Sequence, residues 1–174
     1  LAVPTFFATI QEAIVAAYPE DTVEVSSGTY EESLDLLDKN LVLRSVAGPD
    51  STFIEGDGTG AVLTISGGQS NLTMVNGFTL TGGGGTGGGG VLVDGEATPN
   101  FQRLVLAANT VSGNGAGMLV LSGSVALEHI TMSGNTAGGS GGALYAAAGS
   151  AVTIDNSILW NNGTTEIGSS DNVT

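Results

Sequence analysis

Three segments of the chain repeat one another without gaps, each beginning 26 residues after the one before. They read GFTLTGG from Gly77, RLVLAAN from Arg103 and HITMSGN from His129. A fourth segment, NSILWNN from Asn156, follows after 27 residues, which predicts one extra residue near Ala146 to Ser150. A fixed period of this length is typical of solenoids, in which each repeat packs against its neighbours.

Each repeat contains short runs in which apolar and polar residues alternate, such as VALEHITM and VTIDNSIL. Alternation with a period of two predicts strands with one buried face. Gly, Ser and Asn clusters separate the runs and permit the positive φ of sharp corners. The aligned positions predict three apolar columns and one asparagine column: Phe78, Leu104 and Ile130; Leu80, Leu106 and Met132; Leu92, Met118 and Leu144; Asn109, Asn135 and Asn162.

Two other all-β architectures fit this pattern less well. A propeller blade needs about 40 residues, and a sandwich gives no reason for an in-register repeat. We therefore expect one all-β domain over residues 1–174, a parallel β-helix of about six coils stacked at strand spacing. Glycine is too frequent, at 29 residues, for helices to form in the repeats.

The N-terminal segment has a different pattern. Between Thr5 and Pro19, Ile10, Ala13, Ile14 and Ala17 recur at helical spacing, and Pro19 would end the helix. An open solenoid end needs a cap, so we expect residues 1–20 to cap coils that span 21–162. Residues 163–174 form a polar tail without a comparable cap. Six apolar residues of the first coils should point inward: Val23, Val25, Leu34, Leu36, Leu41 and Leu43.

The opening helix followed by DTVEVSSGTYEE resembles the start of pectin-lyase-like right-handed parallel β-helix proteins. SGNTAGGSGGALY is similar to the Gly-Gly-aliphatic and Asn motifs of polymorphic outer-membrane-protein repeats, and NSILWNN to the closing coil of large bacterial surface proteins. The resemblance implies a right-handed β-helix. It does not select among the lyases, esterases, adhesins and surface proteins of this family, because the shared motifs are turns and core positions.

Charge and composition restrict the location and the partners. The chain has 17 acidic residues against Lys39, Arg44 and Arg103, a formal charge of −14. Such a field repels nucleic acid and anionic lipid. No apolar run is long enough to span a membrane. Because the chain begins at Leu1 without an initiator Met, we expect an extracellular or cell-surface product from which a leader was removed.

Two acidic pairs are weak candidates for binding Ca²⁺, and no other cofactor is expected. Glu55 and Asp57 lie in a Gly-rich turn, which ordinary turn chemistry explains equally well. Glu128 and Asp155 should be neighbours across one coil step and could share a cation, although two solvated acids are the simpler interpretation. Lys39 and Arg44 lie near Asp35 and Asp38, which suggests a solvated ion pair.

Few other residues suggest chemistry. Arg103 and the single histidine, His129, should face outward without acidic neighbours, so no catalytic residue is predicted. Trp160 should also face outward, where it could stack on a sugar ring or be covered by the tail at Ile167. Asn71, Asn162 and Asn172 begin glycosylation sequons. The glycine run Gly82–Gly90 is predicted to be a flexible corner loop.

These features favour a non-catalytic extracellular structural or cell-surface protein. The uncapped end would expose strand edges, which pair readily with another chain. Head-to-tail stacking of copies would then build an open filament. Two alternatives remain: a polysaccharide-binding or lyase-like polysaccharide-degrading β-helix domain, with surface glycans as partners, and a fragment of a larger adhesin.

Overall fold

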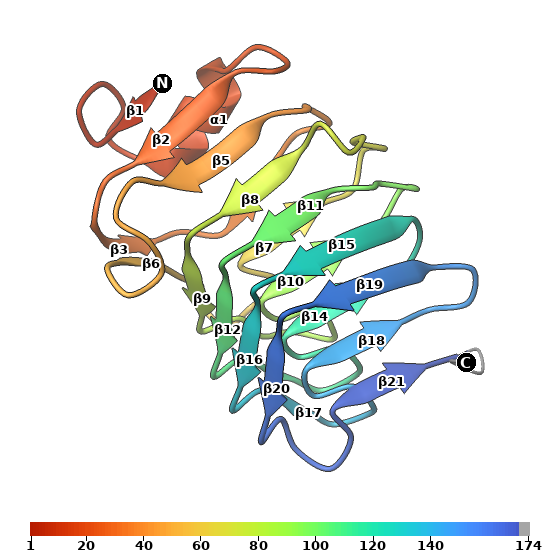
Figure 1. Ribbon diagram of the computed structural model, residues 1–174. Coiled ribbons are helices and arrows are strands. Elements are labelled where there is room, and N and C mark those ends of the chain that lie inside the picture. Colours follow the sequence, from red (N-terminus) through yellow and green to blue (C-terminus); the bar gives the residue numbers. More distant parts are fainter. Residues whose placement is uncertain (171–174) are drawn as a thin grey trace.

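The computed structural model describes residues 1–170, and these form a solenoid of about six coils with one short helix near the N-terminus (Figure 1). Every coil contributes strands to three parallel sheets, which we name A, B and C. Each strand pairs with the strand one coil earlier and one coil later, so the strand order follows the stack. The expected all-β parallel solenoid with an N-terminal helix is therefore confirmed.

The sheets are defined by the following strands. Sheet A contains β1 (Ala2–Val3), β2 (Thr22–Val25), β5 (Val42–Ser45), β8 (Met74–Asn76), β11 (Asn100–Gln102), β15 (Ser124–Glu128) and β19 (Ala151–Asp155). Sheet B contains β3 (Gly28–Glu31), β6 (Thr52–Glu55), β9 (Thr79–Thr81), β12 (Val105–Ala107), β16 (Thr131–Ser133) and β20 (Ile158–Trp160). Sheet C contains β4 (Leu34–Asp35), β7 (Leu63–Ile65), β10 (Val91–Val93), β14 (Met118–Val120), β18 (Leu144–Ala146) and β21 (Ile167–Ser169). A small fourth sheet pairs β13 (Thr110–Val111) with β17 (Thr136–Ala137).

The pairing register confirms most of the repeat alignment. Leu80, Leu106 and Met132 are stacked partners in sheet B. Val120 pairs with Ala146 and Ser124 with Ala151, so the extra residue lies between Ala146 and Ala151, as predicted. The predicted sheet C column is wrong at one position, because Val91 and not Leu92 pairs with Met118. The corner between sheets B and C is one residue longer in the later coil, which a gapless alignment cannot represent.

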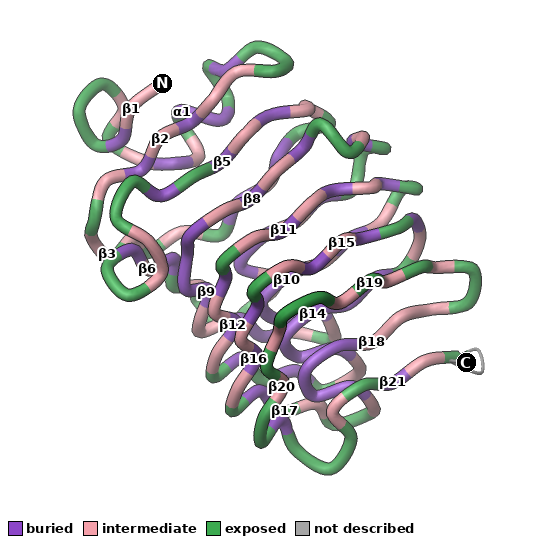
Figure 2. Tube along the Cα trace, in the orientation of Figure 1, coloured by how far each residue is buried: buried purple, intermediate pink, exposed green. Residues whose placement is uncertain are grey.

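The core is an aliphatic column inside the three sheets. The six apolar residues expected to point inward in the first coils are all buried, and Phe78 and Phe101 are the largest fully buried side chains. Figure 2 marks buried segments in the coils from β2 to β18. The side chains of β19 and β20 are only exposed or half-buried. The core therefore thins at the last coil.

The helix α1 (Ile10–Ala16) covers the N-terminal end and is shorter than predicted. Thr9 is its N-cap and forms a capping box with Glu12, which starts the helix well after Thr5. Ala17 adopts an extended ψ of 143° and ends the helix before Pro19. The buried side of α1 carries Ile10, Ala13 and Ile14, in agreement with the predicted apolar face.

Two side chains of the first coils bind the ends of α1. The carboxylate of Glu32 accepts hydrogen bonds from the backbone N–H groups of Ile10 and Gln11, each at 2.9 Å. At the other end, Lys39 Nζ donates to the backbone carbonyls of Ile14, Val15 and Ala17. A negative group at the helix N-terminus and a positive group at its C-terminus both stabilise the helix dipole. The predicted solvated ion pair of Lys39 is therefore wrong.

Single left-handed residues form two corners of the repeating coils. Gly77, Arg103, His129 and Asn156 have φ between 49° and 86° and separate sheet A from sheet B. Gly82, Ala108, Gly134 and Asn161 occupy the equivalent position after sheet B, also at positive φ. The sequence predicted that Gly, Ser and Asn clusters supply such corners. The presence of Arg103, Ala108 and His129 shows that the stacked coils hold ordinary residues in this conformation as well.

The glycine run forms the corner between β9 and β10, as predicted, but it is a packed layer, so the predicted flexibility is wrong. Most residues of Gly83–Gly90 are buried, and a Cβ on Gly84 would lie 2.0 Å from the carbonyl oxygen of Gly58 in the preceding coil. At Gly83 a Cβ would lie 1.8 Å from the oxygen of Gly89. Glycine is needed here because backbones approach closely.

A ladder of three asparagines runs through the stack beside sheet B. Asn109, Asn135 and Asn162 are fully buried, and each lies in the repeat position that the sequence indicated. Asn109 Nδ2 donates to Asn135 Oδ1 at 2.9 Å, and Asn135 Nδ2 donates to Asn162 Oδ1 at 2.7 Å. Asn162 Nδ2 in turn donates to Glu166 Oε2 at 2.7 Å, so this carboxylate completes the ladder.

Candidate functional site

A row of polar side chains crosses the outer face of sheet A from one coil to the next. We call it the polar row. Its members are register partners in neighbouring strands: Glu24, Arg44, Asn76, Gln102, Glu128 and Asp155. Because side chains alternate across a strand, all six lie on the outer face. Neighbouring members are separated by about 4.8 Å, the spacing of adjacent strands.

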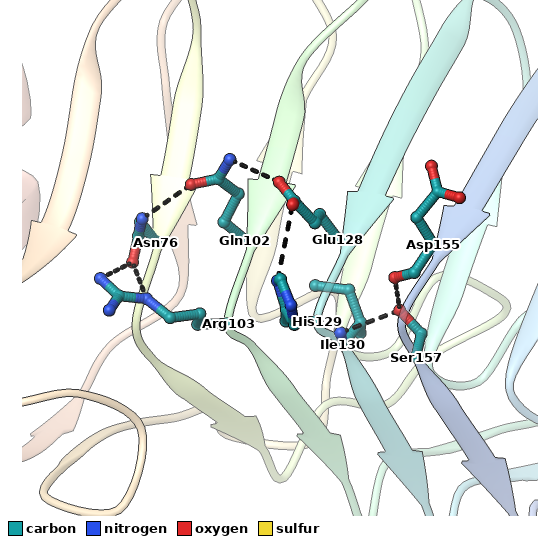
Figure 3. Close-up of polar contacts among 8 residues, drawn as sticks. All are labelled: Asn76, Gln102, Arg103, Glu128, His129, Ile130, Asp155 and Ser157. Atoms are coloured by element: carbon teal, nitrogen blue, oxygen red, sulfur yellow. Dashed lines mark hydrogen bonds and ion pairs between the residues drawn. The ribbon is translucent and has the colours of Figure 1, made fainter.

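The centre of the polar row is a continuous chain of hydrogen bonds (Figure 3). Arg103, at the corner after β11, donates from Nε and Nη2 to Asn76 Oδ1, at 3.1 and 2.9 Å. Asn76 Nδ2 donates to Gln102 Oε1 at 3.2 Å. Gln102 Nε2 donates to Glu128 Oε2 at 2.9 Å. Four side chains from three successive coils are therefore joined.

The two ends of this chain determine how its amides are oriented. A guanidinium group can only donate, and a carboxylate can only accept. Asn76 must therefore present oxygen to Arg103, and Gln102 must present nitrogen to Glu128. Both amides point the same way, with the cation at one end and the anion at the other. The arrangement links the two charges through the two amides.

A surface hollow of about 340 Å³ lies beside Arg103. Its lining combines apolar and cationic side chains: Val42, Arg44, Ser45, Val46, Met74, Asn76 and Arg103. Arg44 also donates to Glu24 Oε1 from Nε, at 3.1 Å, and from Nη2. The neighbouring guanidinium, chiefly through this hydrogen bond, lowers the pKa of the Glu24 carboxyl below its ordinary value. The predicted ion pair of Arg44 exists, but its partner is Glu24.

The predicted neighbours Glu128 and Asp155 are adjacent in the register of β15 and β19. The Glu128 carboxylate is bound to Gln102 on the side away from Asp155, and its Oε1 lies 3.6 Å from His129 Nδ1 (Figure 3). His129 is exposed, as expected, but it has an acidic neighbour that the repeat alignment did not indicate. Within residues 1–170 no three His, Cys, Asp or Glu side chains are grouped to hold a metal. A shared cation therefore stays a prediction.

Glu55 and Asp57 border a second hollow, of about 380 Å³, together with Glu31 and Glu32. Asp57 Oδ1 accepts from Thr59 Oγ1 at 2.7 Å and from Thr59 N at 2.9 Å. These two bonds lower the pKa of the Asp57 carboxyl. Since the carboxylate is used within its own turn and Glu32 is bound to α1, ordinary turn chemistry accounts for the geometry.

Trp160 lies on the outer face of β20 and is 72% exposed. Ile167 does not cover it, because Ile167 lies in sheet C, where it pairs with Leu144. The expected cover by Ile167 is therefore wrong, and the indole face is free to contact a ligand. Ile158, on the same side of β20, is 62% exposed. Together they place an apolar patch on the last coil.

The three sequons have different surroundings. Asn71 is exposed, in a turn before β8. Asn162 is fully buried, and its Nδ2 donates to both Met132 O and Glu166 Oε2. A glycan on that nitrogen is incompatible with the asparagine ladder, so Asn162 is not a glycosylation site of this fold. Asn172 lies outside the described residues.

Comparison with known proteins identifies the family. The model of the family described as right handed beta helix region matches residues 59–174, two thirds of the chain. The chain belongs to the right-handed β-helix family. No curated protein and no solved structure matches it. The match covers the repeats from β7 onward and confirms the expected right-handed fold. The narrower resemblance to pectin-lyase-like members of the β-helix family stays a prediction.

Within residues 1–170, no helix combines the length and the apolar character that a bilayer crossing requires. The helix of this part of the β-helix chain, α1, has seven residues.

Proposed function

We propose that the protein is a non-catalytic structural module of an extracellular or cell-surface assembly. The observation that carries this proposal is the hydrogen-bond chain from Arg103 to Glu128. A catalytic acid or base must have its proton-transferring atom within reach of a substrate. Here the polar side chains of the outer face bind one another across coils. Their arrangement supports a role in holding coils together.

The interior of the rod supports the same role. The asparagine ladder joins coils on one side of the core, and the polar row joins them on the outer face of sheet A. Buried polar groups that are fully satisfied make a structure rigid and unique. A stiff acidic rod of this kind is suited to serve as a spacer or scaffold outside the cell. The charge of −14 keeps such rods apart from other polyanions.

The last coil is where the scaffold would meet another chain. Its inward side chains Val152, Ile154 and Leu159 are only half-buried, and Ile167 is 44% exposed. Exposed apolar surface next to strand edges favours pairing with further β-structure. We propose end-to-end association of copies into a filament. Continued coils of a larger adhesin are the alternative partner for this end.

Negative-stain microscopy with light scattering tests the proposal. Filaments, with a subunit repeat along the axis, are the expected result at high concentration, with or without calcium. The double variant Ile158→Thr, Trp160→Ser should leave filaments unchanged if the inward residues make the contact, whereas Ile154→Lys should abolish them. Short monomeric rods for the parent chain at every concentration would contradict end-to-end association.

Glycan binding is the second candidate, favoured by the exposed indole of Trp160. A flat aromatic face beside the polar groups of sheet B could stack on a sugar ring. Tryptophan fluorescence during titration with neutral and acidic oligosaccharides tests this. Trp160 is the single tryptophan of the chain, so a saturable shift reports on its surroundings directly, and loss of binding in Trp160→Ala, measured by isothermal titration calorimetry, would support it. Release of unsaturated products from pectate or alginate would overturn the non-catalytic proposal.

A further inference from the structure

The cations of this acidic chain are unevenly distributed. The sequence has three Lys and Arg residues against 17 acids. Lys39 is bound to the carbonyls at the end of α1. The remaining two, Arg44 and Arg103, line the same hollow on sheet A. The hollow is therefore a local positive site on a molecule whose field is otherwise negative.

Each arginine has unused donors toward the hollow. A guanidinium group carries five N–H donors in a planar fork. Arg103 uses Nε and Nη2 on a single oxygen, Asn76 Oδ1, and Arg44 uses the same two nitrogens on Glu24 Oε1. The Nη1 edge of each group is free of these contacts. Two such edges offer the geometry that binds carboxylate or sulfate oxygens.

Arg103 is held in place before any ligand binds. Its guanidinium group reaches back to Asn76 in the preceding coil. Its acceptor Asn76 is fixed by Gln102, and Gln102 by Glu128. Asn76 is also the register partner of Arg44, so the two arginines flank one side chain. A group held in this way loses little conformational entropy when it binds.

Arg103 also lacks a direct anionic partner. Among residues 1–170 the acidic side chain paired with an arginine or lysine is Glu24, which is bound by Arg44. Arg103 contacts a neutral amide, so its charge is compensated only at a distance, through Gln102. Its charge is therefore available to attract an external anion.

The size and the remaining lining of the hollow indicate the ligand class. Val42 and Met74 supply an apolar floor beside the two guanidinium groups. About 340 Å³ exceeds what a lone ion needs and reaches the lower range of small-molecule sites, about 300 Å³. We infer that the hollow bounded by Arg44 and Arg103 binds an oxyanion group, carboxylate or sulfate, attached to a compact body that packs on Val42 and Met74.

The inference goes beyond the proposed structural function and does not depend on it, because binding is measured on monomeric rods at low concentration. NMR titration of the uniformly ¹⁵N-labelled full chain is the experiment. The probes are inorganic sulfate, glucuronate, glucose 6-sulfate and glucose. Saturable shifts at Arg44, Asn76 and Arg103 are expected with the two substituted sugars, weaker shifts with inorganic sulfate, and none with glucose.

Three variants separate a built site from general charge. Arg103→Gln should weaken binding by about tenfold or more, since it removes a charge-assisted fork. Thr110→Glu, an exposed change on β13, makes the same change in net charge and should leave binding unaltered. Glu24→Gln should strengthen binding by about threefold, because it releases Arg44 from a surface ion pair. Tighter anion binding by Glu24→Gln could not be explained by misfolding of that variant.

Three results would overturn the inference. Unsaturable shifts spread over the surface would mean that anions only screen the protein. Equal losses of affinity in Arg103→Gln and Thr110→Glu would mean that the net charge of the protein alone determines anion binding. Tighter binding of inorganic sulfate than of either substituted sugar would exclude the apolar floor and leave a simple anion site. Filament formation, measured separately, can succeed or fail without changing any of these outcomes.

Discussion

The ammonium nitrogen of Lys39 lies 2.9 Å from the carbonyl oxygen of Ala17, where helix α1 has ended. The same nitrogen donates to Ile14 and Val15, so one side chain binds three carbonyls at the C-terminal end of the helix, where backbone acceptors lack a full set of intrahelical partners. A cation at this position also interacts favourably with the helix dipole. The charged side chain of Lys39 thus binds helix α1, which covers the N-terminal end of the core, to the first coils.

Lys39→Met should lower the free energy of unfolding by about 2 kcal/mol, since it removes both the dipole interaction and three hydrogen bonds. Urea denaturation followed by circular dichroism measures this. Arg44→Met is the control, because it removes the same charge from an exposed ion pair, which solvent screens and which should therefore change the free energy of unfolding much less. Equal effects in the two variants would show that α1 does not depend on Lys39.

Asn135→Ala interrupts the asparagine ladder at its centre. It leaves the carbonyl of Leu106 and the backbone N–H of Asn109 without their buried partner. Each unsatisfied buried group costs about 1–3 kcal/mol, so we expect a loss of about 3 kcal/mol or more in the free energy of unfolding. Asn71→Ala, in an exposed turn, should change it by less than about 0.5 kcal/mol. Similar midpoints for both variants would contradict a structural ladder.

Gly84→Ala tests the packing of the glycine layer. The added methyl would lie 2.0 Å from a backbone oxygen of the preceding coil, which cannot move without shifting that coil. Overpacking of this kind costs about 1–3 kcal/mol. Gly60→Ala is the matched control, because nothing lies within 4 Å of its added Cβ. Thermal unfolding should separate the two variants, and a Gly84→Ala protein as stable as Gly60→Ala would show that the layer is loose.

The pKa of Glu24 is lowered by Arg44, and this makes one contribution to stability depend on pH. Because the folded pKa lies below the unfolded value, the contribution is complete above about pH 4.5 and is lost as the pH falls through the folded pKa. Arg44→Gln should raise the Glu24 pKa toward its ordinary value. A side-chain carboxyl NMR titration measures the Glu24 pKa in the parent chain and in the variant. An unchanged pKa in the variant would assign the shift to another cause.

Much of the fold could be predicted because the apolar residues recur at a fixed spacing, which indicates the length of one coil. Leu80, Leu106 and Met132 align by sequence and stack in space, since parallel strands without crossover helices have no other way to bury them. Val91 was missed because the gapless alignment placed Leu92 beside Met118, and the corner changes length by one residue. Length changes at corners do not disturb the strands, so alternation alone cannot detect them.

The polar row was largely missed for a different reason. Arg103 was compared with its corner equivalents Gly77 and His129, which are not acidic. Its contact is Asn76, one residue before the corner equivalent Gly77, because a long arginine side chain can reach diagonally across one coil step. The predicted helix was too long because the spacing of apolar residues does not reveal where a helix begins or ends. The ends of α1 are determined by backbone contacts, with the Thr9 cap at one end and Lys39 at the other.

The hydrogen bonds between coils run along the axis of the stack, and this determines how the molecule would respond to force. Tension applied to its two ends pulls each strand away from its neighbour, so bonds open one after another and not together. Coils should therefore detach singly, and each regular coil of the later repeats should release 26 or 27 residues, or about 90 Å of extended chain. A rod of this kind would lengthen in steps under load and dissipate mechanical energy at each step.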